Sequence, residues 1–198
     1  GCALLATFRG AMGCSPTGDS SRRPGKESRL VSLAPAVTET LVALKAQDSL
    51  VGISDHCRVP APLQALPRVG SGYSPRLEAI ALTRPTRILA LTVRGVSLDD
   101  LRGLGPVEAL PWLTLDDIIA STRRLGQLVN EGPLAEDLAR RYQRELDVAA
   151  APGAPSVLLA LAQVPGQLAE VWFIRDQSVH GNVLRAAGGR NAVTWEVT

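Results

Sequence analysis

The sequence is poor in the features that mark several common classes of protein. It has 3 cysteines in 198 residues, and because Cys2 and Cys14 lie at the N-terminus, a framework of disulfide bonds is excluded. The net charge is only +2, and no basic run with interleaved aromatic residues points to nucleic acid. No apolar run reaches the roughly 18 residues that a transmembrane helix needs.

What remains is the composition of an ordinary folded protein, with 45% hydrophobic and 20% charged residues. From residue 29 onward, short apolar runs bounded by turn residues alternate with amphipathic segments, which is typical of βα units. The pattern therefore predicts an α/β fold with a mostly parallel sheet and helices on both faces. The expected strands are 30–33, 50–53, 87–91 and 107–110, with helices near 37–47 and 75–83, from 97, and over 114–130.

Several local signals define where these helices begin. Ser74–Pro75 predicts an N-cap followed by a first-turn proline, and Ser97–Asp100 and Thr114–Asp117 both have the sequence of a capping box. A dense group of prolines predicts that no regular helix or central strand follows residue 58; these are Pro60, Pro62 and Pro67.

The second half of the chain begins with a longer helix at Pro133, which carries one apolar stripe. A stretch rich in Ala, Pro and Gly at 149–155 then interrupts the pattern, and strands at 157–161 and 171–174 and a helix from Ser178 to Ala187 are expected beyond it. We therefore expect four parts: a leader and tether (1–28), an N-terminal α/β lobe (29–132), a connecting helix (133–151), and an incomplete C-terminal α/β lobe (152–198).

The first 28 residues change in character at Cys14, from small and apolar to polar and flexible. The segment Ala11–Cys14 resembles the cleavage site of bacterial lipoproteins, in which a small residue precedes a cysteine that is then acylated. It differs from that pattern because Ala11 stands where leucine is preferred and Arg9 interrupts the apolar run. The alternative is a disordered tail whose cysteine has no role.

The densest group of reactive side chains is Ser54–Arg58, directly after the expected strand 50–53. Ligands of open parallel sheets bind beyond the carboxyl ends of the strands, so a site is expected here. An imidazole next to a thiol could ligate a metal, and a metal- or thiol-dependent enzyme using His56 and Cys57 is one alternative function. Adjacent residues on an extended loop point to opposite sides, however, which disfavours that pair. The simplest alternative is a loop histidine with a satisfied hydrogen bond beside a buried thiol.

A set of motifs in a fixed order extends over most of the chain. The motifs are RLVSLAP at 29–35, TE at 38–39, VGISDHC at 51–57, PRVG at 67–70, LEAI at 77–80, Pro85 and LRAAGGRN at 184–191. With these motifs the chain resembles the periplasmic binding proteins for cobalamin, ferric siderophores and haem, and it is most similar to the cobalamin-binding branch. That resemblance implies two α/β lobes joined by a rigid helix, with a ligand between the lobes that is delivered to an ABC-type importer in the inner membrane.

The resemblance also implies where the cargo would bind. The cargo would be cobalamin or another metal chelate, with haem or a ferric siderophore as the alternative, and no permanent cofactor is implied. His56 stands where the family has an aromatic residue, which makes it both a cleft residue and the one candidate metal ligand. Core packing is the alternative for Phe173. The expected cleft residues are His56, Tyr73, Arg94, Trp172 and Phe173.

Glu78 lies where the family has a glutamate that docks on the permease. The alternative is a solvated first-turn glutamate favoured by the helix dipole. The matching glutamate of the second lobe would follow residues 195–198. The resemblance places the protein in the periplasm or cell envelope, attached to the membrane only through a lipid on Cys14, and implies no enzymatic activity. A signalling or scaffold lobe without cargo is a third possibility.

Overall fold

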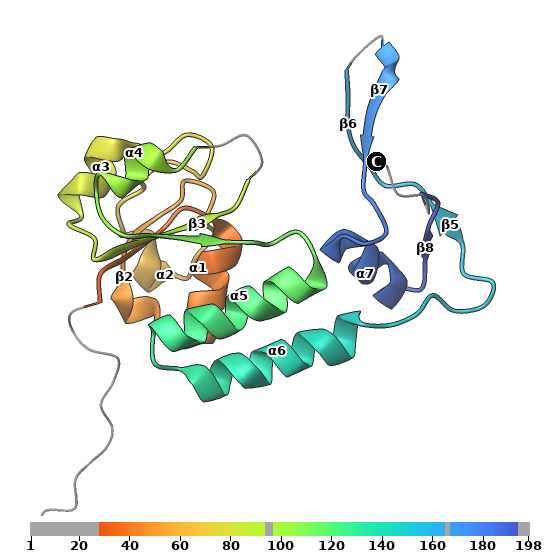
Figure 1. Cartoon of the computed structure of the whole chain (residues 1–198), viewed down its shortest axis with the longest axis horizontal. Helices are drawn as coiled ribbons and strands as arrows, with labels where there is room; N and C mark the ends of the chain where they lie inside the picture. The colour runs from red at the N-terminus through yellow and green to blue at the C-terminus, as the bar shows by residue number, and fades with distance from the viewer. Residues whose placement is uncertain (1–27, 94–96, 165–166, 194–198) are drawn as a thin grey trace, which may run out of the picture.

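The computed structural model describes residues 28–93, 97–164 and 167–193. The predicted lipidation of Cys14, the cleft position of Arg94 and the segment 195–198 lie outside the described residues. Figure 1 shows a first lobe built on a sheet, a pair of long helices below it, and a smaller second lobe beyond them. None of the helices in the described ranges is long and apolar enough to cross a membrane.

The first lobe contains a four-stranded sheet in which all strands are parallel, as predicted. Its order is β2-β1-β3-β4, so the first and third strands lie in the centre. A parallel sheet needs a crossover between consecutive strands, and helices or helical turns supply each one. The strands are β1 (Leu30–Ser32), β2 (Leu50–Ile53), β3 (Arg87–Leu91) and β4 (Val107–Leu110).

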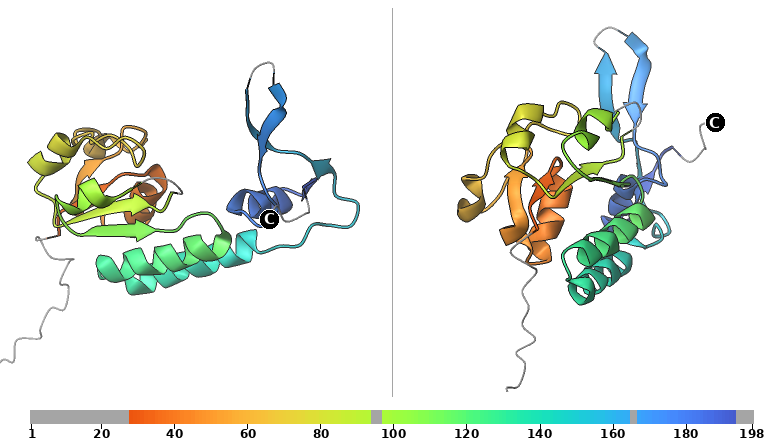
Figure 2. Two further views of the ribbon diagram at one scale, coloured as in Figure 1. Left: turned by 45° about the horizontal axis from the view of Figure 1, so that its top comes forward. Right: turned by 60° about the vertical axis from the view of Figure 1, so that its left-hand side comes forward.

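Helices cover both faces of this sheet, which explains why its central strands are largely buried and mostly apolar. Neighbouring strand residues point to opposite faces: Leu30 and Leu89 join one core cluster, and Val31 and Ile88 join the other. The first cluster is completed by α1 (Pro35–Ala43), α5 (Leu115–Leu128) and α6 (Gly132–Leu146). The second is completed by α3 (Leu77–Leu82) and α4 (Asp99–Arg102) (Figures 1 and 2).

Four predicted helix boundaries are wrong, and one of them is the end of the connecting helix, which was expected at residue 151 and lies at Leu146. The helix expected from Ser74–Pro75 begins at Leu77 with no side-chain cap, because Ser71 and Ser74 instead close a turn, from the Ser71 N–H to the Ser74 carbonyl oxygen at 3.0 Å. The Ser97 capping box does not form, since α4 begins at Asp99 and the Ser97 hydroxyl accepts from the Asp99 N–H. α1 ends at Ala43, and a 3₁₀ turn, η1 (Gln47–Ser49), follows it. The capping box at Thr114 is confirmed.

The proline-rich loop also contains a helix that the sequence analysis excluded. The short α2 (Ala61–Gln64) begins directly after Pro60 and has Pro62 in its first turn. The first N–H groups of a helix have no intrahelical partner, so a proline there removes no hydrogen bond. The prediction was therefore wrong about the first turn of a helix, which is the one place where proline is tolerated.

The helices α5 and α6 lie side by side and lead to the second lobe (Figure 1). They pack closely at Gly126, where a Cβ atom would lie 2.2 Å from the Cβ atom of Ala135. This small-residue contact lets the two backbones approach each other.

The second lobe contains a parallel pair of strands, as expected, and also an antiparallel hairpin that the sequence did not predict. β5 (Ser156–Val157) and β8 (Arg190–Asn191) pair in parallel, with α7 (Val179–Ala186) preceding β8. β6 (Ala160–Val164) and β7 (Gln167–Phe173) are antiparallel. The expected strand 157–161 is thus divided between β5 and β6. A short connection between consecutive strands permits only antiparallel pairing.

Candidate functional site

The loop after β2 is tied to the loop that precedes α3, and Asp55 makes the connection. Its backbone N–H donates to the Gly70 carbonyl oxygen at 2.9 Å, and its carboxylate accepts from the Gly70 N–H at 3.2 Å. The Arg76 guanidinium reaches the same carboxylate oxygen at 2.8 Å and also donates to the Arg68 carbonyl oxygen. Two loops at the carboxyl edge of the sheet therefore form one connected surface.

His56 and Cys57 face different surroundings within this surface. His56 is exposed, whereas Cys57 is 5% exposed, and its sulfur lies 3.2 Å from the Thr38 hydroxyl. The Arg68 guanidinium closes the loop by donating to the carbonyl oxygens of Ser54 and Cys57. The thiol therefore has a hydrogen-bond partner in α1 and not in the imidazole. No group of three or more His, Cys, Asp or Glu side chains suited to a metal ion occurs in the ranges that the structure describes.

Tyr73 lies at the tip of a rigid turn on the second of these loops, and its side chain is 75% exposed. The Gly72 N–H donates to the Leu33 carbonyl oxygen at 3.1 Å, which fixes the turn to the end of β1. Gly70 has φ +87°, and a Cβ atom there would lie 2.3 Å from the Ser74 carbonyl oxygen, so only glycine fits. The fold thus brings His56 and Tyr73 onto one edge of the first lobe, with Tyr73 held out into solvent.

The two aromatic residues predicted for the second lobe lie at the end of β7. Trp172 is 68% exposed and Phe173 is half-buried. Successive strand residues point to opposite faces, so the two rings do not share a side of the hairpin. Figure 1 shows the hairpin β6–β7 standing on the second lobe, apart from the loops that carry His56 and Tyr73.

Glu78 is exposed on the first turn of α3, the face of the helix away from the core contact at Ile80. Leu82, which is 83% exposed, lies one turn further along, and residues four apart share a helix face. The sequence analysis missed Leu82; the i, i+4 spacing from Glu78 could have identified it. The C-terminal end of the helix is held by the Arg29 guanidinium, which donates to the carbonyl oxygens of Thr83 and Arg84.

An ion-pair network behind the site stabilises the sheet edge. Glu108 on β4 accepts two hydrogen bonds from Arg124 of α5, at 2.7 and 3.0 Å, and lies 3.3 Å from Arg87 of β3. The hydrogen bond from Arg124 and both positive charges lower the pKa of the Glu108 carboxyl, against the opposing effect of burial. The network joins β3, β4 and α5.

Comparison with known proteins identifies the class of molecule that carries this site. The family described as "Periplasmic binding protein" matches residues 30–196. The Vitamin B12-binding protein of Pectobacterium carotovorum subsp. carotovorum (strain PC1) is 32% identical over 121 residues, which are 60% of this chain and 44% of the relative. The chain therefore spans less than half of the length of this curated relative.

Solved structures agree with the fold. A periplasmic heme binding protein from Pseudomonas aeruginosa gives a TM-score of 0.68 at 26% identity, over 85% of this chain and 64% of that one. A periplasmic Vitamin B12 binding protein of Vibrio cholerae gives 0.65 at 22% identity, over 86% and 68%. Since the family match extends over residues 30–196, the chain belongs to the periplasmic binding protein family.

Proposed function

We propose that this chain belongs to the cargo-binding component of an ABC-type importer and that its cargo is cobalamin or another corrinoid or metal chelate. The observation that carries the proposal is the paired exposure of His56 and Tyr73 on two interlocked loops at the carboxyl edge of a parallel sheet. Relatives of this chain in Pectobacterium and Vibrio are named as Vitamin B12-binding proteins, which favours a corrinoid as the cargo.

The chemistry of the two side chains suits a flat metal chelate. An imidazole can pack against a macrocycle or ligate its metal, and a phenol offers an aromatic face together with an oxygen donor. Trp172 of the second lobe would cover the opposite side of the ligand, and Phe173 would line the cleft from the other face of the same strand end. Arg94, on the segment after β3, is proposed as a partner for an acidic substituent of the cargo.

Haem or a ferric siderophore is the second candidate cargo. It is favoured by the likeness to the heme binding protein of Pseudomonas aeruginosa, and imidazole and phenolate are both ligands of haem iron in proteins. The two cargos use the same surface and differ in the ligand that the metal accepts.

The proposal includes a membrane partner. Glu78 and Leu82 present a charge and an apolar side chain on one exposed helix face, a combination suited to docking on the importer's permease. We place the protein in the periplasm or cell envelope, with Cys14 as the residue that would carry a lipid anchor. The protein would bind and release its cargo without turnover, since Cys57 is buried against Thr38 and not paired with His56.

A spectroscopic titration tests the cargo. The chain is mixed in turn with aquocobalamin, cobinamide, haemin and a ferric siderophore, and absorbance and heat are recorded. We expect a saturable one-to-one response with aquocobalamin, weakened in His56→Ala. A response to haemin alone would select the second candidate, and no response to any of the four would overturn the proposal.

A further inference from the structure

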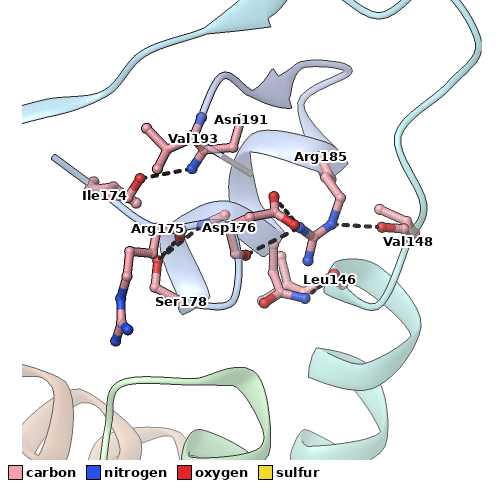
Figure 3. A network of polar contacts seen from close by, with 11 residues as sticks. Leu146, Val148, Ile174, Arg175, Asp176, Ser178, Arg185, Asn191 and Val193 are labelled. Atoms are coloured by element: carbon pink, nitrogen blue, oxygen red, sulfur yellow. Dashed lines mark hydrogen bonds and ion pairs between the residues drawn. The ribbon is translucent and has the colours of Figure 1, made fainter. Parts of the chain in front are cut away.

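The helix α7 meets the end of the long helix α6 at a junction built from side chains (Figure 3). The Asn182 side-chain amide donates to the Leu146 carbonyl oxygen at 3.1 Å, and the Arg185 Nε donates to the Val148 carbonyl oxygen at 3.2 Å. The last carbonyl groups of a helix have no intrahelical partner. Here Asn182 supplies a donor to the last residue of α6, and Arg185 binds the segment just beyond the end of that helix.

Arg185 is itself fixed within the second lobe. Its Nη1 lies 2.6 Å from the Asp176 carboxylate and also donates to the Asp176 carbonyl oxygen at 3.2 Å. The Arg185 side chain is 18% exposed and that of Asp176 is 37% exposed, so this charge pair is partly shielded from water. The segment holding Asp176 is rigid as well, because the Ser178 hydroxyl donates to the Arg175 carbonyl oxygen and a Cβ atom at Gly181 would collide with Asp176.

The N-terminus of α7 contacts the first lobe directly. The Val179 N–H donates to the Leu113 carbonyl oxygen at 2.9 Å, and Leu113 belongs to the loop between β4 and α5. The segments on either side of α7 are also bonded to each other. The buried Asn191 of β8 donates its side-chain amide to the carbonyl oxygen of Ile174, just after β7, and its side-chain oxygen accepts from the Val193 N–H. A single helix is therefore bonded to the first lobe, to the connecting helix and, through its flanking segments, to the strands of its own lobe.

The covalent connection between the lobes could not hold this geometry alone. Residues 147–155 form no helix or strand, and they include Gly153 with φ +78°. Irregular segments rich in small residues permit rotation of the domains they join. We infer that α7 sets the orientation of the second lobe, with Asn182 and Arg185 as positioning residues that act through the end of α6. The consequence for cargo capture rests on the function proposed above.

Distance measurements between spin labels test the inference without any cargo. One label is placed in the first lobe by Asp48→Cys and the other in the second lobe by Leu158→Cys, both at exposed positions. Cys2 and Cys14 are replaced by alanine, while the buried Cys57 can stay because buried thiols react poorly. Pulsed electron resonance then gives the distribution of distances between the lobes in the full chain.

We expect a single narrow distribution in the parent chain and a broader, shifted one in Arg185→Ala and in the milder Asn182→Ala. Arg185→Lys should restore part of the narrow distribution, because it keeps one charged donor. Arg175→Ala is the matched control, since its guanidinium points away from the network in Figure 3 and the distribution should not change. Circular dichroism establishes that each variant is folded.

The inference is overturned if Asn182→Ala and Arg185→Ala, both folded, keep the parent distribution, or if the Arg175→Ala control broadens it equally. Should Arg185→Ala fail to fold, Asn182→Ala decides the matter alone. A wild-type chain that binds none of the four cargos would refute the proposed function and leave the lobe geometry intact. If cargo does bind, the variants with broadened distances should bind it more weakly, with full affinity in Arg175→Ala.

Discussion

At the scale of single residues, the site depends on one glycine as much as on the side chains that would touch a ligand. Tyr73 projects from a turn that exists only because Gly70 adopts φ +87° beside the Ser74 carbonyl oxygen. Asp55, next to His56, receives the N–H of the same glycine. The relative positions of His56 and Tyr73 therefore depend on the backbone at Gly70.

We predict that Gly70→Ala displaces Tyr73 and weakens cargo binding. The left-handed backbone and the collision with the Ser74 carbonyl oxygen should lower the free energy of unfolding by about 1–3 kcal/mol. Urea unfolding and cargo titration of the variant measure the two effects. Gly72→Ala is the control, because a Cβ atom there has an ordinary contact at 3.8 Å from the Leu33 carbonyl oxygen. Equal losses in the two variants would show that the φ of Gly70 is not the cause.

How far the sequence anticipates this site is clear from the same residues. The strand 50–53 and its loop with His56 follow from an apolar run and a group of prolines. The interlocking of that loop with the turn at 71–74 does not, because Asp55 meets Gly70 and Arg76 through contacts fifteen and more residues away. Ser74–Pro75 has the local sequence of a helix start, and the turn that it forms instead is decided by Gly70 and by the hydrogen bond from Gly72 to β1.

At the scale of elements, the parallel sheet was predictable and the hairpin of the second lobe was not. Each strand of the first lobe lies in a short, mostly apolar run, and α5 is predicted by its capping box and its apolar stripe. For the hairpin, only the end of β7 was expected, as a strand at 171–174, and the run from Val157 to Leu161 reads as one strand although the structure divides it between β5 and β6. The bounds of such strands are decided by pairing with strands distant in sequence, and the hydrophobic periodicity of a segment does not identify those partners.

The Glu108 network gives a prediction at this scale. The pKa of the Glu108 carboxyl is lowered in the folded state. The stabilisation is therefore fully present above the unfolded-state pKa near 4.5 and is lost as pH falls through the lower folded-state pKa. Glu108→Gln should therefore lower the free energy of unfolding by about 1 kcal/mol at pH 7 and by less at pH 3. Urea unfolding at the two pH values measures this.

Glu145→Gln is the control for Glu108. Its pair with Arg141 is exposed on both sides, at 64% and 56%, so the substitution should change the unfolding free energy by less than about 0.5 kcal/mol at pH 7. If the loss in Glu108→Gln is the same at pH 3 as at pH 7, the carboxylate charge is not the source of the stabilisation.

At the scale of the whole molecule, the proposed function assigns two tasks to different surfaces of one lobe. His56 lies on the loops at the carboxyl edge of the sheet, and Glu78 lies on the outer face of α3. Glu78 follows Tyr73 by only five residues in the sequence, so the separation of the two tasks is a matter of direction more than of distance. Arg76 even joins the two regions, because it precedes the helix and pairs with Asp55.

The final prediction separates these tasks. Glu78→Ala should leave cargo affinity nearly intact, because an exposed side chain on the outer helix face contributes less than about 0.5 kcal/mol to the fold and would not face the ligand. It should slow association with the reconstituted importer and reduce the dependence of that association on salt, since exposed interfacial charges act mainly on encounter. His56→Ala should do the reverse, weakening cargo binding while docking is unchanged.

The measurements are cargo titration and importer binding at several salt concentrations for both variants, with Asp48→Ala as an exposed acidic control in the same lobe. If Glu78→Ala loses as much cargo affinity as His56→Ala, the two surfaces are not distinct. If Asp48→Ala shows a docking defect as large as that of Glu78→Ala, docking depends on negative charge in general and not on Glu78.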